Sequence, residues 1–281
     1  QPGLLPVLDL GATPLVDRHM TKEQLYVPEP FFPLEVVFCR SCSLVQILET
    51  VAPETLFCQD YTYYSSFSDA LLRHSRENVL ELIDRRRLGA DSLVVELASN
   101  DGYLLKNYIE RGVQVLGIDP AEGPVDAARK IGVPTVQAFF TRELAETLVA
   151  EGKRADVIHA NNVLAHVADT NGFVSGIGTL LADSGVAVIE VPYVKDLIDH
   201  CEFDTIYHEH LCYFSVTALD HLFRRHGLYL NEVRRIPIHG GSLRLYVERN
   251  ERVGDSVTEL LRVERDEGVD RYEYYRSFAA R

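Results

Sequence analysis

The stretch SLVVELASNDGYLLKNYIERG, residues 92–112, decides the fold. Its first part, SLVVEL (92–97), is a short apolar run, as expected of a strand that is buried on both faces of a parallel sheet. The part GYLLKNYIERG (102–112) predicts a helix that ends at a glycine. The loop between them therefore lies at the carboxyl end of a strand, which is where open α/β sheets bind their ligands.

The same alternation of strand and helix continues along the chain. Strands are predicted at 113–119, 134–139, 155–160 and 185–191, and helices at 122–131, 141–151 and 171–182. Five such units predict the α/β class, with a doubly wound and mostly parallel sheet. A serine-capped helix at 215–227 follows, and the strands predicted at 228–237 and 242–248 are expected to form a terminal antiparallel pair.

The first 60 residues lack this alternation. They are rich in proline and contain only short apolar alternations, so we expect a small, irregular segment. A helix is predicted at 68–87, where Leu72, Val79 and Ile83 recur at helical spacing. The chain opens with Gln1 and closes on a charged helical segment, so we expect both ends to continue in a longer protein.

The composition excludes several classes of function. Hydrophobic residues make up 46% and charged residues 25% of the 281 positions, an ordinary globular balance. The net charge of −14 argues against nucleic acid and against anionic membrane surfaces, because both require a basic face. No apolar run reaches the roughly 18 residues of a membrane span. Five cysteines, an odd number, favour a reducing compartment, so we expect a cytoplasmic protein. We also expect a monomer.

The loop ELASNDG (96–102) suits a ligand that carries an amine. It lacks the three glycines with which dinucleotide-binding loops approach a pyrophosphate, and it supplies Glu96, Asn100 and Asp101 instead. Asp119 ends the next strand, near the offset at which an acidic residue binds a ribose diol. These features favour S-adenosylmethionine, which has an ammonium, a sulfonium and a ribose but no phosphate. The alternative is that Glu96 and Asp101 serve only as loop and helix-cap residues.

Polar residues also follow the fourth strand. Asn161 and Asn162 supply neutral polar groups where the methyl donor and its acceptor would meet, and His166 can reach the same place. A single histidine at the start of a helix is as often a packing or capping residue.

Seven motifs occur in one order: CRSCSLVQ, DYTYYSS, VVELASNDGYLL, GIDPA, NNVLAHV, IYHEHLCYFS and HGGSLRLYV. Together they resemble the sugar C-methyltransferases of bacterial deoxysugar biosynthesis over essentially the whole chain. The YHEH and HGGSLR blocks are specific to that group rather than to methyltransferases in general. The resemblance implies a class I S-adenosylmethionine methyltransferase fold. It also implies an acceptor that is a nucleotide-linked 4-keto-deoxyhexose for antibiotic biosynthesis.

The resemblance also implies three parts, of which the last is a C-terminal domain that helps hold the sugar nucleotide. We expect a partial, zinc-ribbon-like zinc-binding segment at 1–60, a linking helix and acceptor-contacting loop at 61–90, the methyltransferase domain at 91–250, and a helical connector at 251–281 that leads to a missing C-terminal domain. The family binds zinc through two CxxC pairs, and this chain has one, Cys39 and Cys42, with Cys58 as a doubtful third ligand. Because structural zinc takes four ligands, we expect zinc in the full-length protein only.

By analogy with the family, the YHEH block carries the chemistry. Carbon methylation beside a ketone requires a base that removes a proton, and neutral histidine suits this role. We expect His210 to be the base, and Glu209 to orient or polarise it or to contact the sugar. Tyr207 and Tyr61 are expected to donate hydrogen bonds to the sugar or enolate, and His166 to line the pocket. The residues expected to bind the donor are Glu96, Ala98, Asn100, Asp101, Asp119, Pro120, Phe139, Asn161 and Asn162.

Some alternatives stay open. His208 and His210 could bind a metal, although His208 is expected to be structural. His239, Gly240, Gly241 and Ser242 are expected to contact the substrate, or to form only a tight turn. Arg244 could pair with a diphosphate or face solvent. The rival functions are O- or N-methylation of another small molecule, methylation at C5 rather than C3 of the sugar (expected as a dTDP derivative), and a zinc-stabilised binding protein without activity.

Overall fold

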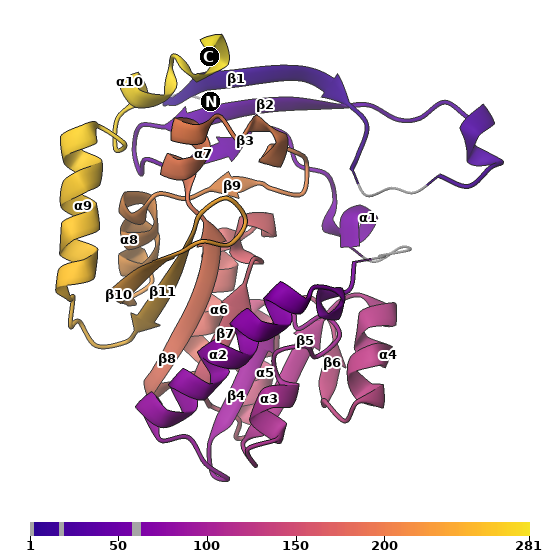
Figure 1. Ribbon diagram of the computed structural model, residues 1–281, viewed down its shortest axis with the longest axis vertical. Helices are drawn as coiled ribbons and strands as arrows, with labels where there is room; N and C mark the ends of the chain where they lie inside the picture. Colours follow the sequence, from indigo (N-terminus) through magenta and orange to yellow (C-terminus); the bar gives the residue numbers. More distant parts are fainter. Residues whose placement is uncertain (1–2, 17–19, 58–62) are drawn as a thin grey trace.

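The computed structural model describes residues 3–16, 20–57 and 63–281, and these ranges contain a larger and a smaller β-sheet (Figure 1). The larger sheet has the strand order β10-β11-β8-β7-β4-β5-β6. Strands β4 to β8 are parallel, β11 is antiparallel to β8, and β10 is antiparallel to β11. This confirms the predicted doubly wound sheet with its terminal antiparallel pair. The strands are β4 (Leu93–Leu97), β5 (Gln114–Asp119), β6 (Thr135–Gln137), β7 (Ala155–Asn161), β8 (Leu181–Pro192), β10 (Tyr229–Ile236) and β11 (Ser242–Glu248).

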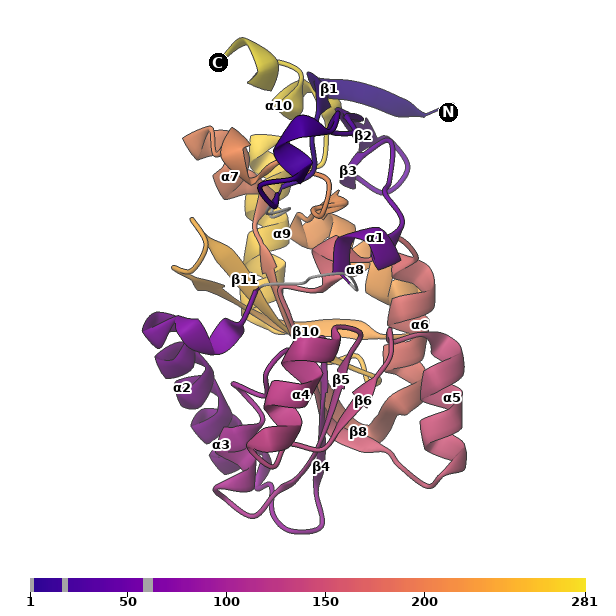
Figure 2. The same cartoon turned by 90° about the vertical axis from the view of Figure 1, so that its right-hand side faces the viewer.

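The central strands are buried on both faces. Val94 and Val157 belong to one apolar cluster, whereas Val95 and Ile158 belong to the other, because successive side chains of a strand point to opposite faces. Helices α2 and α3 cover the first face, and α5 and α6 cover the second (Figure 2). This two-sided burial is the physical reason for the apolar runs in the sequence.

The helices agree with the prediction in most places. Within the described ranges, none is long and apolar enough to cross a membrane. The α-helices are α1 (Pro53–Phe57), α2 (Asp69–Arg86), α3 (Lys106–Ile109), α4 (Glu122–Lys130), α5 (Arg142–Ala150), α6 (Thr170–Leu180), α7 (Val194–His200), α8 (Val216–Arg225), α9 (Asp255–Glu267) and α10 (Tyr272–Tyr275). The short 3-10 helices are Gln24–Tyr26, Ser65–Phe67, Leu164–His166, Phe203–Thr205 and Phe278–Ala280.

Helix α3 is much shorter than the predicted 102–112. Its first turn is tightened, because the N–H groups of Asn107 and Tyr108 in α3 donate to the carbonyls of Leu104 and Leu105, three residues earlier. The Asn107 side chain also donates to the carbonyls of Tyr103 and Leu104. Because these side-chain bonds compete with the helical pattern, the regular helix begins only at Lys106.

The N-terminal segment is more regular than expected. Strands β1 (Leu4–Thr13), β2 (Phe32–Cys39) and β3 (Val45–Ile47) form an antiparallel sheet, and β9 (Cys212–Tyr213), from far along the chain, pairs with β3. In β2, Leu34, Val36 and Phe38 alternate and are buried. Figure 1 shows this smaller sheet above the larger one. The pairing of β3 with β9 places the end of the YHEH block on this sheet.

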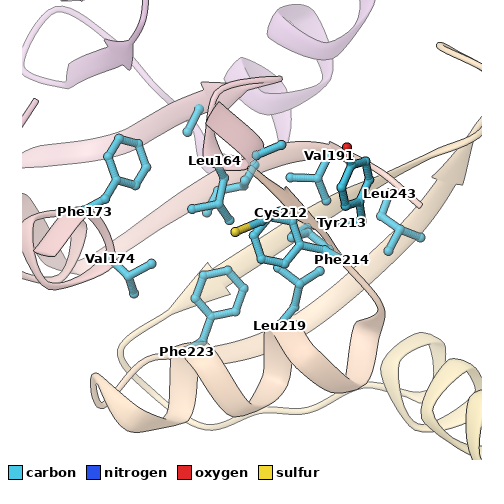
Figure 3. Packing of buried hydrophobic residues seen from close by; sticks show 14 of the residues in the cluster. Leu164, Phe173, Val174, Val191, Cys212, Tyr213, Phe214, Leu219, Phe223 and Leu243 are labelled. Atoms are coloured by element: carbon cyan, nitrogen blue, oxygen red, sulfur yellow. The ribbon is translucent and has the colours of Figure 1, made fainter. Parts of the chain in front are cut away.

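The segment after the YHEH block is anchored in the core. Figure 3 shows Phe214 packed among Leu219 and Phe223 of α8, with Leu164, Val191 and Leu243 nearby. All of these side chains are buried. The backbone on the C-terminal side of His210 is therefore held by apolar packing.

His159 contributes to the dependence of stability on pH. It lies on β7 without exposed surface, and the hydroxyl of Tyr108 lies 2.9 Å from its Nε2. Burial lowers the pKa of His159 to about 3. The unfolded chain binds this proton near pH 6.5, so the stabilisation by the neutral ring is complete above about pH 6.5 and is lost as the pH falls toward 3.

We expect His159→Gln to make the protein less sensitive to acid. Between pH 6.5 and 5.5 the wild-type free energy of unfolding should fall by about 1 kcal/mol more than that of the variant. Urea unfolding of both proteins at the two pH values measures this difference. Equal losses would show that His159 does not resist protonation.

Candidate active site

A cavity of about 1190 Å³ lies at the carboxyl ends of the parallel strands. Its wall includes Ala98 after β4, Pro120 after β5, Asn162 after β7 and Tyr193 after β8, together with Phe57 of α1. The strand order reverses between β4 and β7, and the loops that follow both strands line the cavity. This is the position in which open α/β sheets bind ligands.

Most of the predicted site residues that the structure describes lie on this cavity. Glu96, Asp101, Gly240 and Ser242 do not, and Tyr61 lies outside the described residues. The predicted residues that line the cavity are Ala98, Asn100, Asp119, Pro120, Phe139, Asn161, Asn162, His166, Tyr207, Glu209, His210, His239 and Gly241.

Asp119 joins two of the loops at the strand ends. Its Oδ2 accepts the backbone N–H of Asn100 at 2.8 Å, and its Oδ1 accepts that of Ala121 at 2.9 Å. Burial raises the pKa of Asp119 above its usual range, although the two N–H donors oppose this shift. The carboxylate is thus fixed in position at the cavity wall.

The loop after β4 is strained. Ala98 and Asn100 have φ angles of 54° and 47°, in the left-handed region that residues other than glycine seldom adopt. Asn tolerates this region better than Ala. Such strain in a cavity wall indicates a functional constraint on the loop.

Glu96 lies beneath this loop and is almost completely buried. Burial raises its pKa well above the usual range, and the negative charges of Asp119 and Asp101 add to the shift. The folded protein therefore favours the neutral form of this carboxyl group. Glu96 does not line the cavity, and within the described residues its Oε2 is buried without a hydrogen-bond partner.

Asn161 and Asn162 present unused acceptors. Within the described residues, the Oδ1 atom of each is buried and has no hydrogen-bond partner. Both residues line the cavity, and the backbone N–H of Asn162 donates to the carbonyl of Glu190 at 2.8 Å. Because unpaired buried acceptors are costly, these two oxygens are suited to a ligand that donates hydrogen bonds.

His210 is held with its Nε2 available as a base. Its Nδ1 lies 2.7 Å from the carbonyl oxygen of Thr205, which can only accept a hydrogen bond. The proton of the neutral ring is therefore on Nδ1, and Nε2 accepts from the Tyr207 hydroxyl at 2.9 Å. Burial lowers the pKa of His210 below its usual value, despite the opposing bond to Thr205.

His166 and Tyr207 flank this ring. His166 meets His210 edge to face with ring centroids 4.8 Å apart, and Tyr207 lies 4.1 Å away by the same measure. Burial lowers the pKa of His166 to about 3, and the neighbouring His210 adds to the shift. We call His166, Tyr207 and His210 the histidine cluster. It provides two neutral imidazoles and a phenol at one wall of the cavity.

The YHEH segment is irregular, so its neighbours can share the cavity. Glu209 and His210 both line it, as was expected only for an irregular segment. His208 instead is 1% exposed, and its Nε2 lies within 3.2 Å of the carbonyl oxygens of Phe32 and Pro33. His208 therefore fastens the segment to β2, the structural role that was expected.

The turn at 239–242 contributes less to the cavity than predicted. His239 and Gly241 line it, but the Ser242 hydroxyl donates to the carbonyl of Ile238 at 2.9 Å. A Cβ on Gly240 would lie 2.6 Å from a carboxylate oxygen of Glu202, and its φ is +78°. Gly240 thus serves the turn and its close packing.

Arg244 neither faces solvent nor is free to hold a diphosphate. It lies opposite Glu190 on the neighbouring strand and is 6% exposed. Its Nε donates to Glu190 at 2.6 Å, and its terminal nitrogen lies 3.0 Å from His74. An alternating strand normally exposes such a residue, but α2 covers this face of the sheet.

Several residues of the wall were not predicted. Tyr103 and Leu71 line the cavity, and Glu202 packs beside the 239–241 turn. Thr205 contributes a backbone carbonyl, for which a sequence contains no signal. Tyr103 follows the ELASNDG loop directly, and that position was the only available indication.

The CxxC pair lies away from the cavity. Cys39 ends β2, and Cys42 follows in the turn that leads to β3. Both are partly exposed free thiols. Within the described residues, no group of three or more His, Cys, Asp or Glu side chains could hold a metal, and Cys58 lies outside them. The described residues therefore supply two of the four ligands that structural zinc requires.

Three family models match the chain. Residues 70–233 match one described as "Methyltransferase domain", residues 1–57 one described as "Putative zinc binding domain", and residues 237–281 one described as "C-methyltransferase C-terminal domain". The first of these alone covers more than half of the chain.

Two relatives in bacteria carry methyltransferase names. The chain is 35% identical over 278 residues to the C-methyltransferase NovU of Streptomyces niveus. This alignment covers 98% of this chain and 66% of the relative. It is 26% identical over 122 residues to a ubiquinone biosynthesis O-methyltransferase of Azorhizobium caulinodans, covering 43% of this chain and 47% of the relative. The chain thus spans less than two thirds of the length of these relatives.

Solved structures support the fold. The Burkholderia thailandensis 1,6-didemethyltoxoflavin-N1-methyltransferase, solved with S-adenosylhomocysteine, has a TM-score of 0.52 and 16% identity, covering 77% of this chain and 96% of that one. The magnesium protoporphyrin IX methyltransferase of Synechocystis has a TM-score of 0.50 and 15% identity, covering 68% and 90%. At this identity the likeness concerns the fold alone.

The geometry predicts a single tautomer for His210. In ¹⁵N NMR spectra, Nδ1 should carry the proton and Nε2 should be unprotonated at pH 7, because the Thr205 carbonyl accepts only from Nδ1. The ring should titrate below pH 6.5. Tyr207→Phe should shift the Nε2 resonance and leave Nδ1 protonated. A proton on Nε2 in the wild type would refute this arrangement.

Proposed function

Because the chain belongs to the C-methyltransferase family, we propose that it transfers a methyl group from S-adenosylmethionine to a carbon atom beside a ketone. The observation that carries this proposal is the histidine cluster, in which His210 has an unprotonated Nε2 and lines the same cavity as the strand-end loops. A hydroxyl oxygen already has a lone pair with which to attack the methyl group. A saturated carbon becomes a nucleophile only after a base placed beside its C–H bond has removed the proton.

The strand-end loops suit the methyl donor. Asp119 is fixed where a ribose diol would bind, and the unpaired Oδ1 atoms of Asn161 and Asn162 can accept from its ammonium group. Ala98, Pro120 and Phe139 complete this part of the wall. The donor, when bound, supplies a methyl group on a positively charged sulfur. Asn100 and Asp101 were predicted to contact it too, and these contacts stay predictions. Asn100 lines the cavity and Asp101 does not, and their side chains accept the backbone N–H groups of Ser65 and Ser66.

His210 acts as the general base. Its neutral ring removes the proton from the carbon next to the keto group, through Nε2, and the Thr205 carbonyl stabilises the ring as it becomes charged. The resulting enolate carbon forms a bond to the methyl carbon while the sulfur–methyl bond breaks, which leaves S-adenosylhomocysteine. The proton on His210 is then released to solvent, so atoms and charge balance.

The residues around His210 would stabilise the enolate. The Tyr207 hydroxyl donates to Nε2 in this structure and can turn to the developing oxyanion when an acceptor occupies the cavity. Glu209 lies beside it on the wall, and His166 keeps a neutral ring against His210. Tyr61 remains a prediction, as a second donor to the sugar.

For the acceptor we propose a nucleotide-linked 4-keto-deoxyhexose, with dTDP as the nucleotide and C3 as the methylated carbon. The order of the seven motifs and the similarity to a C-methyltransferase support this choice. His239 and Gly241 would contact the sugar from the 239–242 turn. Methylation at C5 is the alternative, since C3 and C5 both lie beside the C4 ketone and the same base could remove a proton from either carbon.

We also propose that the full-length protein binds structural zinc through Cys39 and Cys42, with the remaining ligands supplied from beyond the described residues. The match of residues 1–57 to a zinc-binding model supports this. The two thiols are far from the histidine cluster in sequence and do not line the cavity. Zinc would therefore fix the N-terminal sheet and take no part in methyl transfer.

We expect methyl-deuterated S-adenosylmethionine to label a ring carbon of a nucleotide-linked 4-keto-2,6-dideoxyhexose. Fragmentation of the product by mass spectrometry locates the label. Label on an oxygen or nitrogen atom would contradict carbon methylation and would support the rival O- or N-methylation.

We expect His210→Asn to lower kcat about 10²- to 10⁴-fold, the usual contribution of a positioned base, while S-adenosylhomocysteine binds as before. His221→Asn is a matched control, because His221 lies on α8, outside the cavity wall, with its Nδ1 3.3 Å from the carbonyl oxygen of Cys42. A His210→Asn enzyme with the wild-type kcat would exclude this residue as the base.

The activity should also depend on pH through His210. Burial lowers the pKa of His210 below 6.5, and the base must be neutral, so kcat/KM should stay level at neutral pH and decline only at a pH below 6.5. A profile of kcat/KM from pH 5 to 8 measures this limb. A decline that begins well above pH 6.5 would show that a different group controls the reaction.

A further inference from the structure

Residues 63–66, which lead into α2, lie against two of the loops at the strand ends. We call them the docking segment. Tyr63 and Ser65 line the cavity together with Ala98, Asn100 and Pro120. The docking segment is therefore part of the same wall as the loops that follow β4 and β5, which we call the donor loops. In the chain, 35 positions separate Ser65 from Asn100 in the first of these loops.

Asn100 is fully engaged with this segment. Its Oδ1 accepts the backbone N–H of Ser65 at 2.9 Å, and its Nδ2 donates to the carbonyl of Tyr63 at 3.1 Å. Its own backbone N–H donates to Oδ2 of Asp119 at 2.8 Å. One residue thus joins the docking segment to the carboxylate that we assign to the ribose of the donor.

Two further contacts hold the segment. Oδ2 of Asp101 accepts the backbone N–H of Ser66 at 3.2 Å. The hydroxyl of Tyr64 lies over Gly123, where a Cβ would approach it to 2.7 Å. Gly123 belongs to the first turn of α4, directly after the Asp119 loop. Both donor loops therefore have a face that is shaped to receive residues 63–66.

We propose that Asn100 and Asp101 are positioning residues that couple binding of the methyl donor to docking of residues 63–66. This inference rests on the proposed function, because it takes the strand-end loops as the donor site. A donor that engages Asp119 stabilises the hydrogen bond from the Asn100 backbone to Asp119, and the Asn100 side chain then holds Tyr63 and Ser65 more firmly in the cavity wall. The acceptor consequently meets the complete wall more often after the donor has bound.

The coupling must be reciprocal. If donor binding multiplies the equilibrium constant for docking by some factor, docking multiplies the affinity for the donor by the same factor. Couplings of this kind typically change an equilibrium about 5- to 150-fold. The strain in the loop agrees with this role, because Asn100 holds φ at 47° while its Oδ1 and Nδ2 each form a hydrogen bond with the segment.

The experiment measures hydrogen exchange of the Ser65 and Ser66 amides in the 281-residue chain, with and without S-adenosylhomocysteine. These two N–H groups donate to Asn100 and Asp101, so their exchange reports docking directly. In the wild type we expect S-adenosylhomocysteine to slow both amides about 5- to 150-fold. In Asn100→Gly the ligand should still bind, but most of this slowing should disappear.

Asn100→Gly isolates the side chain. Glycine adopts the left-handed backbone without strain, so the loop keeps its path while the two side-chain hydrogen bonds are removed. Asn231→Ala is the matched control. Asn231 is a buried asparagine that also holds backbone, at Asn250 and Arg252, but it lies outside the cavity wall. It should show the same slowing as the wild type.

The outcomes separate this inference from the proposed function. Binding of S-adenosylhomocysteine without any slowing of the two amides overturns the coupling and leaves the methyltransferase proposal intact. Equal slowing in Asn100→Gly, or its loss in Asn231→Ala, overturns the role of Asn100. Failure of the wild type to bind S-adenosylhomocysteine overturns the proposed function, and the coupling falls with it.

Discussion

The pairing of β4 with β5 on one side and β7 on the other is the constraint on which the site depends. Because the three strands are parallel and buried, they end at the same edge of the sheet, and their loops must meet there. Asp119 then bonds the backbone of the β4 loop to that of its own loop. The N-terminal sheet holds the YHEH segment at this edge, because β9 pairs with β3 and His208 binds β2, and His210 of that segment lines the cavity.

Burial decides the charges in this region. Desolvation holds the Glu96 carboxyl group, His166 and His210 toward their neutral forms, since a charged group loses hydration when it leaves water. A neutral imidazole is the form that can remove a proton. By contrast, Glu190 remains ionised, because burial, which raises its pKa, is outweighed by His74 and Arg244. The enzyme thus separates a charged structural pair under α2 from a neutral reactive cluster in the cavity.

The sequence predicted what local patterns encode. Apolar runs such as SLVVEL predicted the parallel strands, and most of the predicted site residues in the described ranges line the cavity, including Asp119 and His210. It did not predict contacts between distant residues, such as Asn100 with Ser65 or Arg244 with Glu190, because a pairing across 35 or 54 positions leaves no local signal. The β1–β2 sheet was missed for a related reason, since residues 14–31 separate its strands.

The central claim is that His210 forms an enolate before the methyl group moves. The most direct test incubates the enzyme in D₂O with S-adenosylhomocysteine and a nucleotide-linked 4-keto-2,6-dideoxyhexose, so that no methyl group is available. With the wild type, deuterium should enter the carbon beside the ketone much faster than it does without enzyme. With His210→Asn, the rate of deuterium incorporation should equal that background rate. Wild-type exchange at the background rate, or equal exchange by the variant, would contradict it.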